Sequence, residues 1–444
     1  MLIRFEASNY RSIAEGVELS MVAVDRDREA ARDAPHLGES LLTRAAIYGP
    51  NASGKSNVIG ALAWLRDAVE NSLRLWEDEI PLEPFAFGSG PTGPSEFVIE
   101  TTVGGVRFEY IVELDARHIS YEGLFHYPEK KRRRIFEREG SELKLQRGLG
   151  ALAGTRELLT ERTLALSGAR RFDEPLVTNF AREILRIQVL GQLPRRGRSG
   201  TLYNRLRPRP FSRTDTVQWF DGPGNDQPLL FPLSLFGEGE VPLSDEHKEW
   251  STLSRRQQAL ALLRLADLGI KDVVIDRQEV LSGTGEPMSQ RRLRLLHRSG
   301  NDSTPLDFSA ESEGTRTWFG LIGPVLTALQ AGSIVIFDEL DASLHPTLSA
   351  ELLRVFQSPV TNPHGAQLIF TSHDTSLLNH LNRDEVWLTE KQLDGSTRLG
   401  ALAEFAGERV RKSQNLESAY LHGRFGALPQ VDQTEFLRAL GLIG

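Results

Sequence analysis

One stretch of the sequence decides the fold: Gly49-Pro50-Asn51-Ala52-Ser53-Gly54-Lys55-Ser56. It follows an apolar run typical of a short strand, TRAAIYGP (43–50), and it leads into apolar residues at helical spacing in SNVIGALAWLRDAVENSLRLW (56–76). A glycine-rich turn between a strand and a helix, with the pattern G-x-x-x-x-G-K-[ST], indicates a phosphate-binding loop. The plainer alternative is a glycine-rich turn that binds no nucleotide.

The loop pattern gives its residues distinct tasks. Backbone N–H groups and the helix N-terminus cradle phosphates in such loops. We therefore expect the residues from Gly49 to Asn57 to surround the phosphates of a nucleotide. Within this range, Lys55 is expected to reach the β and γ oxygens, and the hydroxyl of Ser56 to bind Mg²⁺.

Two acids end a second apolar run. SIVIFDE (333–339) is typical of a buried strand that ends in Asp338 and Glu339. Alone, this pair would indicate only the end of a strand. Beside a phosphate loop, Asp338 is expected to hold Mg²⁺ and Glu339 to polarise the attacking water.

A histidine ends a third apolar strand, LIFTSHD (368–374). A histidine at a strand end is more often structural than functional. Ligands of open α/β sheets, however, bind outside the carboxyl ends of the strands. With the other two motifs present, we expect His373 to approach the γ-phosphate.

The chain divides into three predicted regions. Residues 1–150 form an N-terminal lobe with the phosphate loop and an antiparallel sheet, in which Gly104-Gly105 makes a hairpin turn. Residues 151–265 read as a mainly helical insertion, with long loops over 194–244. Residues 266–444 return to alternating strands and helices and carry both later motifs.

Composition limits the function further. The 444 residues exceed one typical core, and the formal charge of −8 disfavours nonspecific nucleic-acid binding by the whole surface. No cysteine is present, and no apolar run is long enough for a membrane span, so we expect a cytoplasmic protein without membrane contact. Two basic runs, Lys130 to Arg134 and Arg195 to Arg213, are either solvated loops or contacts for an anionic partner such as nucleic acid.

Taken together, the motifs resemble the ATPase heads of the ABC, SMC and RecF group. The closer resemblance is to the AAA-type ATP-binding proteins of abortive phage infection and related bacterial defence. It is carried by NYRSI (9–13), IYGPNASGKSN (47–57), ESEGT (311–315), IFDELDASLHP (336–346), FTSHD (370–374) and AYLHGRFGALP (419–429). It covers roughly residues 1–150 and 260–430.

The resemblance implies an α/β fold: a phosphate-loop nucleotide-binding head with a mixed sheet flanked by helices, an antiparallel β subdomain and a mainly helical insertion. It implies ATP and Mg²⁺ as ligands and ATP hydrolysis. It also implies a homodimer or a higher even homo-oligomer, in which Ser312 and Gly314 of a signature loop serve the nucleotide of the partner chain. A nuclease or toxin is the expected effector.

Alternatives from other classes remain open. A RecF-like or SMC-like ATPase of DNA repair or recombination would contact DNA through the arginines from Arg195 to Arg213. A self-contained nuclease with a Toprim domain is disfavoured, because the 71 residues after His373 are too few for that domain. The glutamine loop of the group has no counterpart that we can place, and simple N-capping is the alternative role for Ser312.

Overall fold

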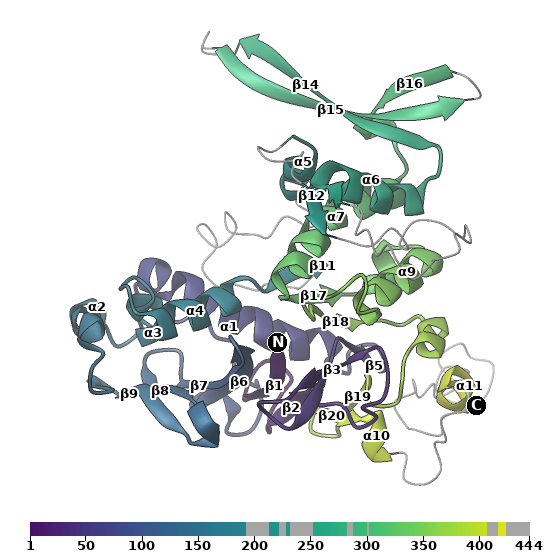
Figure 1. The fold of residues 1–444 in the computed structure, drawn as a ribbon. Helices are drawn as coiled ribbons and strands as arrows, with labels where there is room; N and C mark the ends of the chain where they lie inside the picture. The colour runs from purple at the N-terminus through teal and green to yellow at the C-terminus, as the bar shows by residue number, and fades with distance from the viewer. Residues whose placement is uncertain are drawn as a thin grey trace, which may run out of the picture.

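The computed structural model describes residues 1–191, 213–221, 228–230, 252–281, 287–299, 302–405 and 416–422. Its main layers are a seven-stranded antiparallel sheet and a six-stranded, mostly parallel sheet. Figure 1 shows a third part, a three-stranded sheet, projecting from the helices that cover the six-stranded sheet. Within the described residues, no helix combines the length and apolar character needed to cross a membrane.

The seven-stranded sheet belongs to the N-terminal region. Its strands, in spatial order, are β10 (Glu142–Leu145), β9 (Arg133–Glu139), β8 (Ile119–His126), β7 (Val106–Leu114), β6 (Ser95–Val103), β1 (Leu2–Ser8) and β2 (Val17–Ser20). Gly104 and Gly105 connect β6 to β7 with φ angles of 57° and 76°, a left-handed backbone that favours glycine. The predicted antiparallel sheet and its hairpin turn are confirmed.

The six-stranded sheet combines segments from distant parts of the chain. Its order is β11 (Gln188–Gly191), β17 (Ile334–Asp338), β18 (Gln367–Thr371), β5 (Arg44–Tyr48), β19 (Val386–Lys391) and β20 (Thr397–Ala401). All neighbours are parallel except β19 and β20. The carboxyl ends of β17, β18 and β5 therefore meet at one edge, which is where the three predicted motifs lie.

Helix α1 (Lys55–Leu75) lies between the two sheets. Its buried residues, Val58 and Leu62 among them, pack with Phe97 of the seven-stranded sheet and Ile47 of the six-stranded sheet in one core. The alternate residues of β5 face a second core on the opposite side, formed with α7 (Glu313–Ala331), α9 (Pro346–Gln357) and α6 (Arg255–Ala266). The strand alternation therefore supplies both faces of the sheet with apolar side chains.

The segment 151–265 contributes to both cores. Helices α3 (Ala165–Ala169) and α4 (Pro175–Leu185) pack in the core of α1, whereas α5 (Arg213–Asp221) and α6 pack against α7. Strand β11 is an edge strand of the six-stranded sheet, a place that the helical prediction did not anticipate. The shorter elements are α2 (Thr155–Leu158), β12 (Pro228–Leu230) and β13 (Thr252–Ser254). The prediction of loops over 194–244 is wrong at α5 and β12. The other residues of 194–244 lie outside the described residues, and so does the arginine-rich run except for Arg213.

The projecting part is a three-stranded antiparallel sheet of β14 (Ile270–Leu281), β15 (Pro287–Ser299) and β16 (Asp302–Asp307). It precedes the predicted signature loop in the chain. The remaining elements are β3 (Ala31–Ala34), β4 (Glu39–Leu42), α8 (Leu340–Ser343), α10 (Leu402–Phe405) and α11 (Leu416–Leu421).

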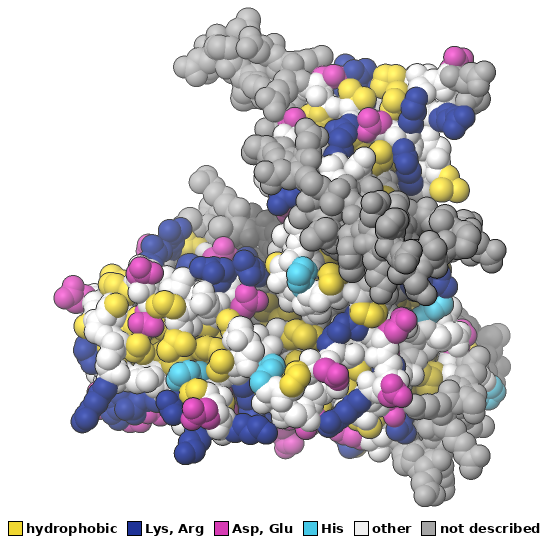
Figure 2. All heavy atoms as spheres, viewed as in Figure 1, with side chains coloured by type: hydrophobic (Ala, Val, Ile, Leu, Met, Phe, Trp, Pro, Cys, Tyr) yellow, Lys and Arg dark blue, Asp and Glu magenta, His cyan; other side chains and the backbone are white. Residues whose placement is uncertain are grey.

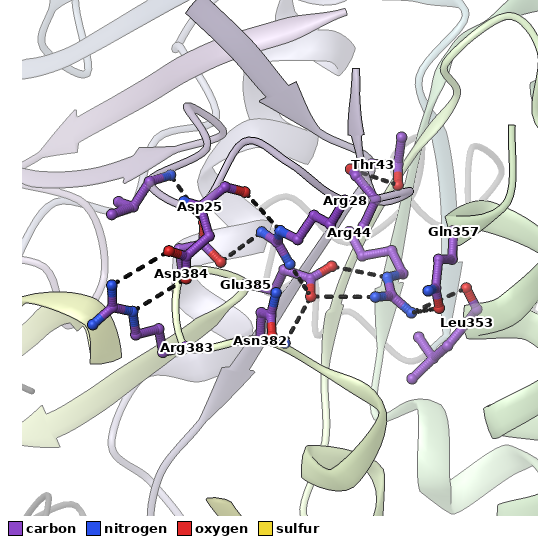
Figure 3. A network of polar contacts seen from close by, with 12 residues as sticks. Asp25, Arg28, Thr43, Arg44, Leu353, Gln357, Asn382, Arg383, Asp384 and Glu385 are labelled. Carbon is purple, nitrogen blue, oxygen red and sulfur yellow. Dashed lines mark hydrogen bonds and ion pairs between the residues drawn. The ribbon is translucent and has the colours of Figure 1, made fainter. Parts of the chain in front are cut away.

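A buried charged network ties the N-terminal segment to the amino edge of the six-stranded sheet (Figure 3). Arg44, the first residue of β5, is 2% exposed and pairs with Glu385 at 2.9 Å. Arg28 pairs with the same carboxylate at 2.8 Å and with Asp384 at 2.6 Å. Because Glu385 immediately precedes β19, this network fixes β5 and β19 at the end opposite the three motifs.

Candidate functional site

The loop after β5 has the backbone of a phosphate cradle. Gly49 has a φ of 151° and Gly54 a φ of 101°, a region that residues with a Cβ rarely adopt. A Cβ on Gly49 would lie 2.4 Å from the carbonyl oxygen of Thr389, and a Cβ on Gly54 would lie 2.0 Å from Oγ1 of Thr397. Glycine is therefore required at both positions, for conformation and for space.

Side chains from β19, from β20 and from the loop after β1 hold the cradle. Ser53 Oγ lies 2.6 Å from Thr389 Oγ1, and Thr397 Oγ1 donates to the carbonyl of Ser53 at 2.9 Å. Ser12 Oγ lies 2.7 Å from Thr397 Oγ1 and accepts from Asn57 Nδ2 at 2.6 Å. Our sequence reasoning assigned no role to Thr389 or Thr397, and it had Ser12 only as part of the NYRSI stretch.

The Lys55 side chain lies inside the loop. Its residue is 6% exposed, and Nζ donates to the carbonyls of Gly49 and Pro50, each at 3.0 Å. Burial lowers the pKa of Lys55, and the carboxylates of Asp338 and Glu339 oppose that shift. The ammonium is thus held by neutral acceptors close to two acids. Asn51 and Ala52 are exposed at the tip of the loop.

Ser56, Asp338 and Thr371 form a chain of hydrogen bonds across the strand ends. Ser56 Oγ donates to Asp338 Oδ1 at 2.9 Å, and Thr371 Oγ1 donates to the same oxygen at 2.7 Å. Burial raises the pKa of Asp338, while the two hydroxyl hydrogen bonds lower it. Asp338 is 1% exposed, so it lies at the bottom of the site.

Glu339 has an unusual backbone. Its φ of 55° is left-handed, and its N–H donates to Thr371 Oγ1 at 2.7 Å. Such a conformation in a residue with a side chain costs about 1–3 kcal/mol and persists where its surroundings enforce it. Thr371 therefore connects both acids, and our sequence reasoning gave it no role although it lies within the FTSHD motif.

His373 lies at the exposed end of β18. Its N–H donates to Asp341 Oδ1 at 3.1 Å. Partial burial and the charge of Lys55 lower the pKa of His373, although Asp341 and Glu339 oppose this. The structure thus brings Lys55, Ser56, Asp338, Glu339 and His373 to one edge of the sheet, from three segments of the chain.

The oxygen donors at this edge fit Mg²⁺. Mg²⁺ prefers oxygen ligands and commonly takes only one or two from the protein, with water and phosphate completing its shell. The hydroxyl of Ser56 and the carboxylate of Asp338 are already within hydrogen-bond distance of each other. No cluster of three or more His, Cys, Asp and Glu side chains suited to a metal occurs in the described residues.

The signature-loop residues have a different environment. Ser312 is the N-cap of α7, accepting from the N–H of Thr315 at 3.1 Å, so its predicted alternative role is realised. Ser312 and Gly314 are both exposed. In the described part of the chain, no hydrogen bond joins either residue to the phosphate loop.

The basic run from Lys130 to Arg134 is exposed where β8 turns into β9. Figure 2 shows Lys and Arg side chains gathered at the rim where these strands lie in Figure 1. Much of the charge is paired within the chain, since Arg132 binds Glu109 at 2.7 Å and Arg134 binds Glu137 at 2.9 Å. This pairing favours the solvated-loop alternative.

The sequence of the chain matches a family model. The model of a family described as "AAA domain, putative AbiEii toxin, Type IV TA system" matches residues 44–164 and 233–379, more than half of the chain. The matched ranges include the phosphate loop, Asp338, Glu339 and His373. No curated protein matches the chain.

Two solved structures are similar over most of their length. The SMC head domain from Thermotoga maritima is 10% identical, with a TM-score of 0.38, and the match covers 90% of this chain and 98% of that chain. A crystal structure of an SMC head bound to the C-winged helix domain of ScpA is 12% identical, with a TM-score of 0.37, and the match covers 90% of this chain and 97% of that chain.

Proposed function

The chain belongs to the family of AbiEii-toxin-like AAA domains, and we propose that it binds ATP with Mg²⁺, hydrolyses ATP and works as a dimeric switch in anti-phage defence. The observation that carries the ATPase part is the contact of Ser56 with Asp338 at 2.9 Å beneath the phosphate loop. This pairing of a loop hydroxyl with a strand-end carboxylate is the arrangement that phosphate-loop NTPases use for Mg²⁺.

The protein residues would act as follows. The N–H groups of the loop and of the start of α1 would bind the β and γ phosphates, because the first N–H groups of a helix lack carbonyl partners one turn back. The N–H of Asn57 is an exception, since it donates to the carbonyl of Gly54 at 2.9 Å. Lys55 Nζ leaves its carbonyl partners, Gly49 and Pro50, for the phosphate oxygens. Ser56 and Asp338 would hold Mg²⁺, which neutralises phosphate charge when bound.

Glu339 is the acid that we propose to orient water. Its backbone N–H donates to Thr371, which also donates to Asp338, so the backbone of Glu339 is held beside Asp338. We assign it the task of polarising the attacking water, and we assign His373 a contact with the γ-phosphate. Both assignments depend on hydrolysis being carried out at this edge of the sheet.

A second copy of the chain would complete the site. Ser312 and Gly314 are exposed at the start of α7, where helix N–H groups and the positive end of the helix dipole favour an anion. His373 and the loop tip are also exposed. Two chains packed face to face would bring the α7 start of one to the γ-phosphate of the other, which supports a homodimer or a higher even homo-oligomer.

The cellular role is the further part of the proposal. We infer that nucleotide-driven dimerisation in the cytoplasm signals to an effector, a nuclease or a toxin, during abortive infection. The family description supports this inference by naming a toxin system. Contact with nucleic acid through Arg195 to Arg213 is also proposed, and that run lies outside the described residues apart from the backbone of Arg213.

Two variants separate binding from chemistry. Lys55→Ala should lose ATP binding, because the phosphate charges lose their cation. Glu339→Gln should bind ATP but release phosphate slowly. Lys144→Ala, a change of a half-exposed lysine on β10, is the matched control and should behave as wild type. Wild-type turnover by Glu339→Gln would overturn the assignment of the acid, and unchanged ATP affinity in Lys55→Ala would overturn the nucleotide site itself.

A further inference from the structure

The C-terminal helix α11 packs against the segment that carries His373. Leu416, Ala419 and Tyr420 are buried in the core of the six-stranded sheet. Figure 1 shows α11 at the rim of the molecule, on the side of β19 and α10. The end of the helix, residues 419–421, begins the AYLHGRFGALP stretch, which the proposed catalytic roles leave unexplained.

One contact of α11 is with the short 3-10 helix that follows His373, residues Thr375–His380. Glu417 accepts from Thr375 Oγ1 at 3.2 Å and from Asn379 Nδ2 at 2.7 Å. Asp374 caps the same 3-10 helix by accepting from the N–H of Ser376 at 2.9 Å. The residues directly after His373 are therefore fixed from α11.

The other contact of α11 is with the strand that leads into the phosphate loop. The ring of Tyr420 meets the ring of Tyr48 edge to face, with centroids 6.1 Å apart and planes at 62°. Tyr48 is the last residue of β5 and immediately precedes Gly49. Its hydroxyl donates to the carbonyl of Asp374 at 3.0 Å, so it joins the start of the phosphate loop to the residue after His373.

The two contacts hold His373 from its C-terminal side, while Asp341 holds its N–H. Tyr48 is 1% exposed and Tyr420 is 7% exposed, so the Tyr420 ring fills the space beside Tyr48. Without that ring, Tyr48 gains room to leave the carbonyl of Asp374, and water gains access to that carbonyl. Aromatic pairs of this geometry contribute beyond their buried area, which makes the position of Tyr48 sensitive to its partner.

We propose that Tyr420 is a positioning residue, which acts through Tyr48 and Asp374 to set His373 toward the γ-phosphate. The inference rests on the proposed ATPase function. It assigns α11 a task in turnover and none in the initial binding of ATP, since the phosphate cradle is held by Ser12, Thr389 and Thr397 instead.

The test is the kinetics of the full chain with three substitutions in α11. Tyr420→Ala should lower kcat by about tenfold, the effect of losing about 1.4 kcal/mol in the transition state, while KM for ATP changes less than about twofold. Tyr420→Phe keeps the ring contact with Tyr48 and should restore kcat. Leu421→Ala changes an exposed residue of the same helix, 56% exposed, and should match wild type.

Glu417→Ala keeps the experiment decisive if Tyr420→Ala does not fold. It removes the hold on the 3-10 helix without emptying a core, so kcat should again fall while KM holds. If Tyr420→Ala folds, an unchanged kcat in that variant would overturn the inference. If Tyr420→Ala does not fold, an unchanged kcat in Glu417→Ala would overturn it. Equal losses in kcat for Tyr420→Ala and Leu421→Ala would also overturn it. A wild-type chain that hydrolyses no ATP would instead overturn the proposed function, and this inference with it.

Discussion

The substitution Thr371→Val removes one buried hydroxyl and leaves the shape of the side chain nearly unchanged. Thr371 is fully buried and connects the two acids, donating to Asp338 at 2.7 Å and accepting from the Glu339 N–H at 2.7 Å. Valine leaves the Glu339 N–H without this acceptor and Asp338 with one hydroxyl donor fewer, and a buried group left unsatisfied costs about 1–3 kcal/mol. The free energy of unfolding should fall accordingly in urea titrations.

Thr371→Val should lower kcat more than it lowers the affinity for ATP. Glu339 loses the bond that fixes its left-handed backbone, so kcat should fall roughly 10-fold to 100-fold, at about 1.4 kcal/mol for each factor of ten. Asp338 keeps its bond from Ser56 but loses a hydroxyl that lowers its pKa, so half-maximal rate should require more Mg²⁺.

Thr371→Ser is the matched control, because it keeps the hydroxyl and removes only a methyl group. Phosphate release under saturating ATP, with ATP affinity measured separately, compares the two variants. A Thr371→Val protein with wild-type kcat would refute the reasoning, as would a Thr371→Ser protein impaired to the same degree.

Three further changes test other parts of the structure. Gly54→Ala should abolish ATP binding measured by calorimetry, because its Cβ would lie 2.0 Å from Oγ1 of Thr397; retained affinity would contradict the cradle geometry. Glu385→Ala leaves the buried guanidinium of Arg44 without its carboxylate and should lower the free energy of unfolding by about 3–5 kcal/mol in urea titrations; a loss below about 1 kcal/mol would contradict it. Glu122 of β8 is fully buried, and burial raises its pKa above the ordinary 4.5. Its contribution to stability is therefore full below pH 4.5 and is lost as the pH rises through the folded pKa. The free energy of unfolding of Glu122→Gln, relative to that of wild type, should therefore rise between pH 4.5 and the folded pKa of Glu122. A difference that does not change with pH would contradict the raised pKa.

The sequence predicts the elements with strong periodicity or strong turn chemistry. Helix α1, the hairpin at Gly104-Gly105 and the apolar strands before Asp338 and His373 all lie where the patterns indicate. Strand β11 has only four residues and follows α4 closely, so it carries no alternation of its own, and its place is decided by pairing with β17. Long-range pairing of this kind leaves no local signal.

The candidate site likewise contains some residues that local sequence patterns indicate and others that only the fold reveals. Lys55, Ser56, Asp338 and Glu339 stand in local patterns whose chemistry is readable from spacing. Thr389 and Thr397 reach the phosphate loop from more than 300 residues away in the chain, through hydroxyls that are ordinary in any strand. Their role follows from the position of β19 beside β5, which only the fold reveals.

The central claim is that a second copy of the chain completes the ATPase site. Mixing Lys55→Ala with Ser312→Arg tests it directly, because each variant alone should be inactive while a mixed dimer contains one site with neither lesion. We predict ATP hydrolysis by the mixture above the sum of the two separate preparations. A mixture no faster than that sum, in subunits shown to exchange, would mean that one chain contains the whole site and would contradict the account.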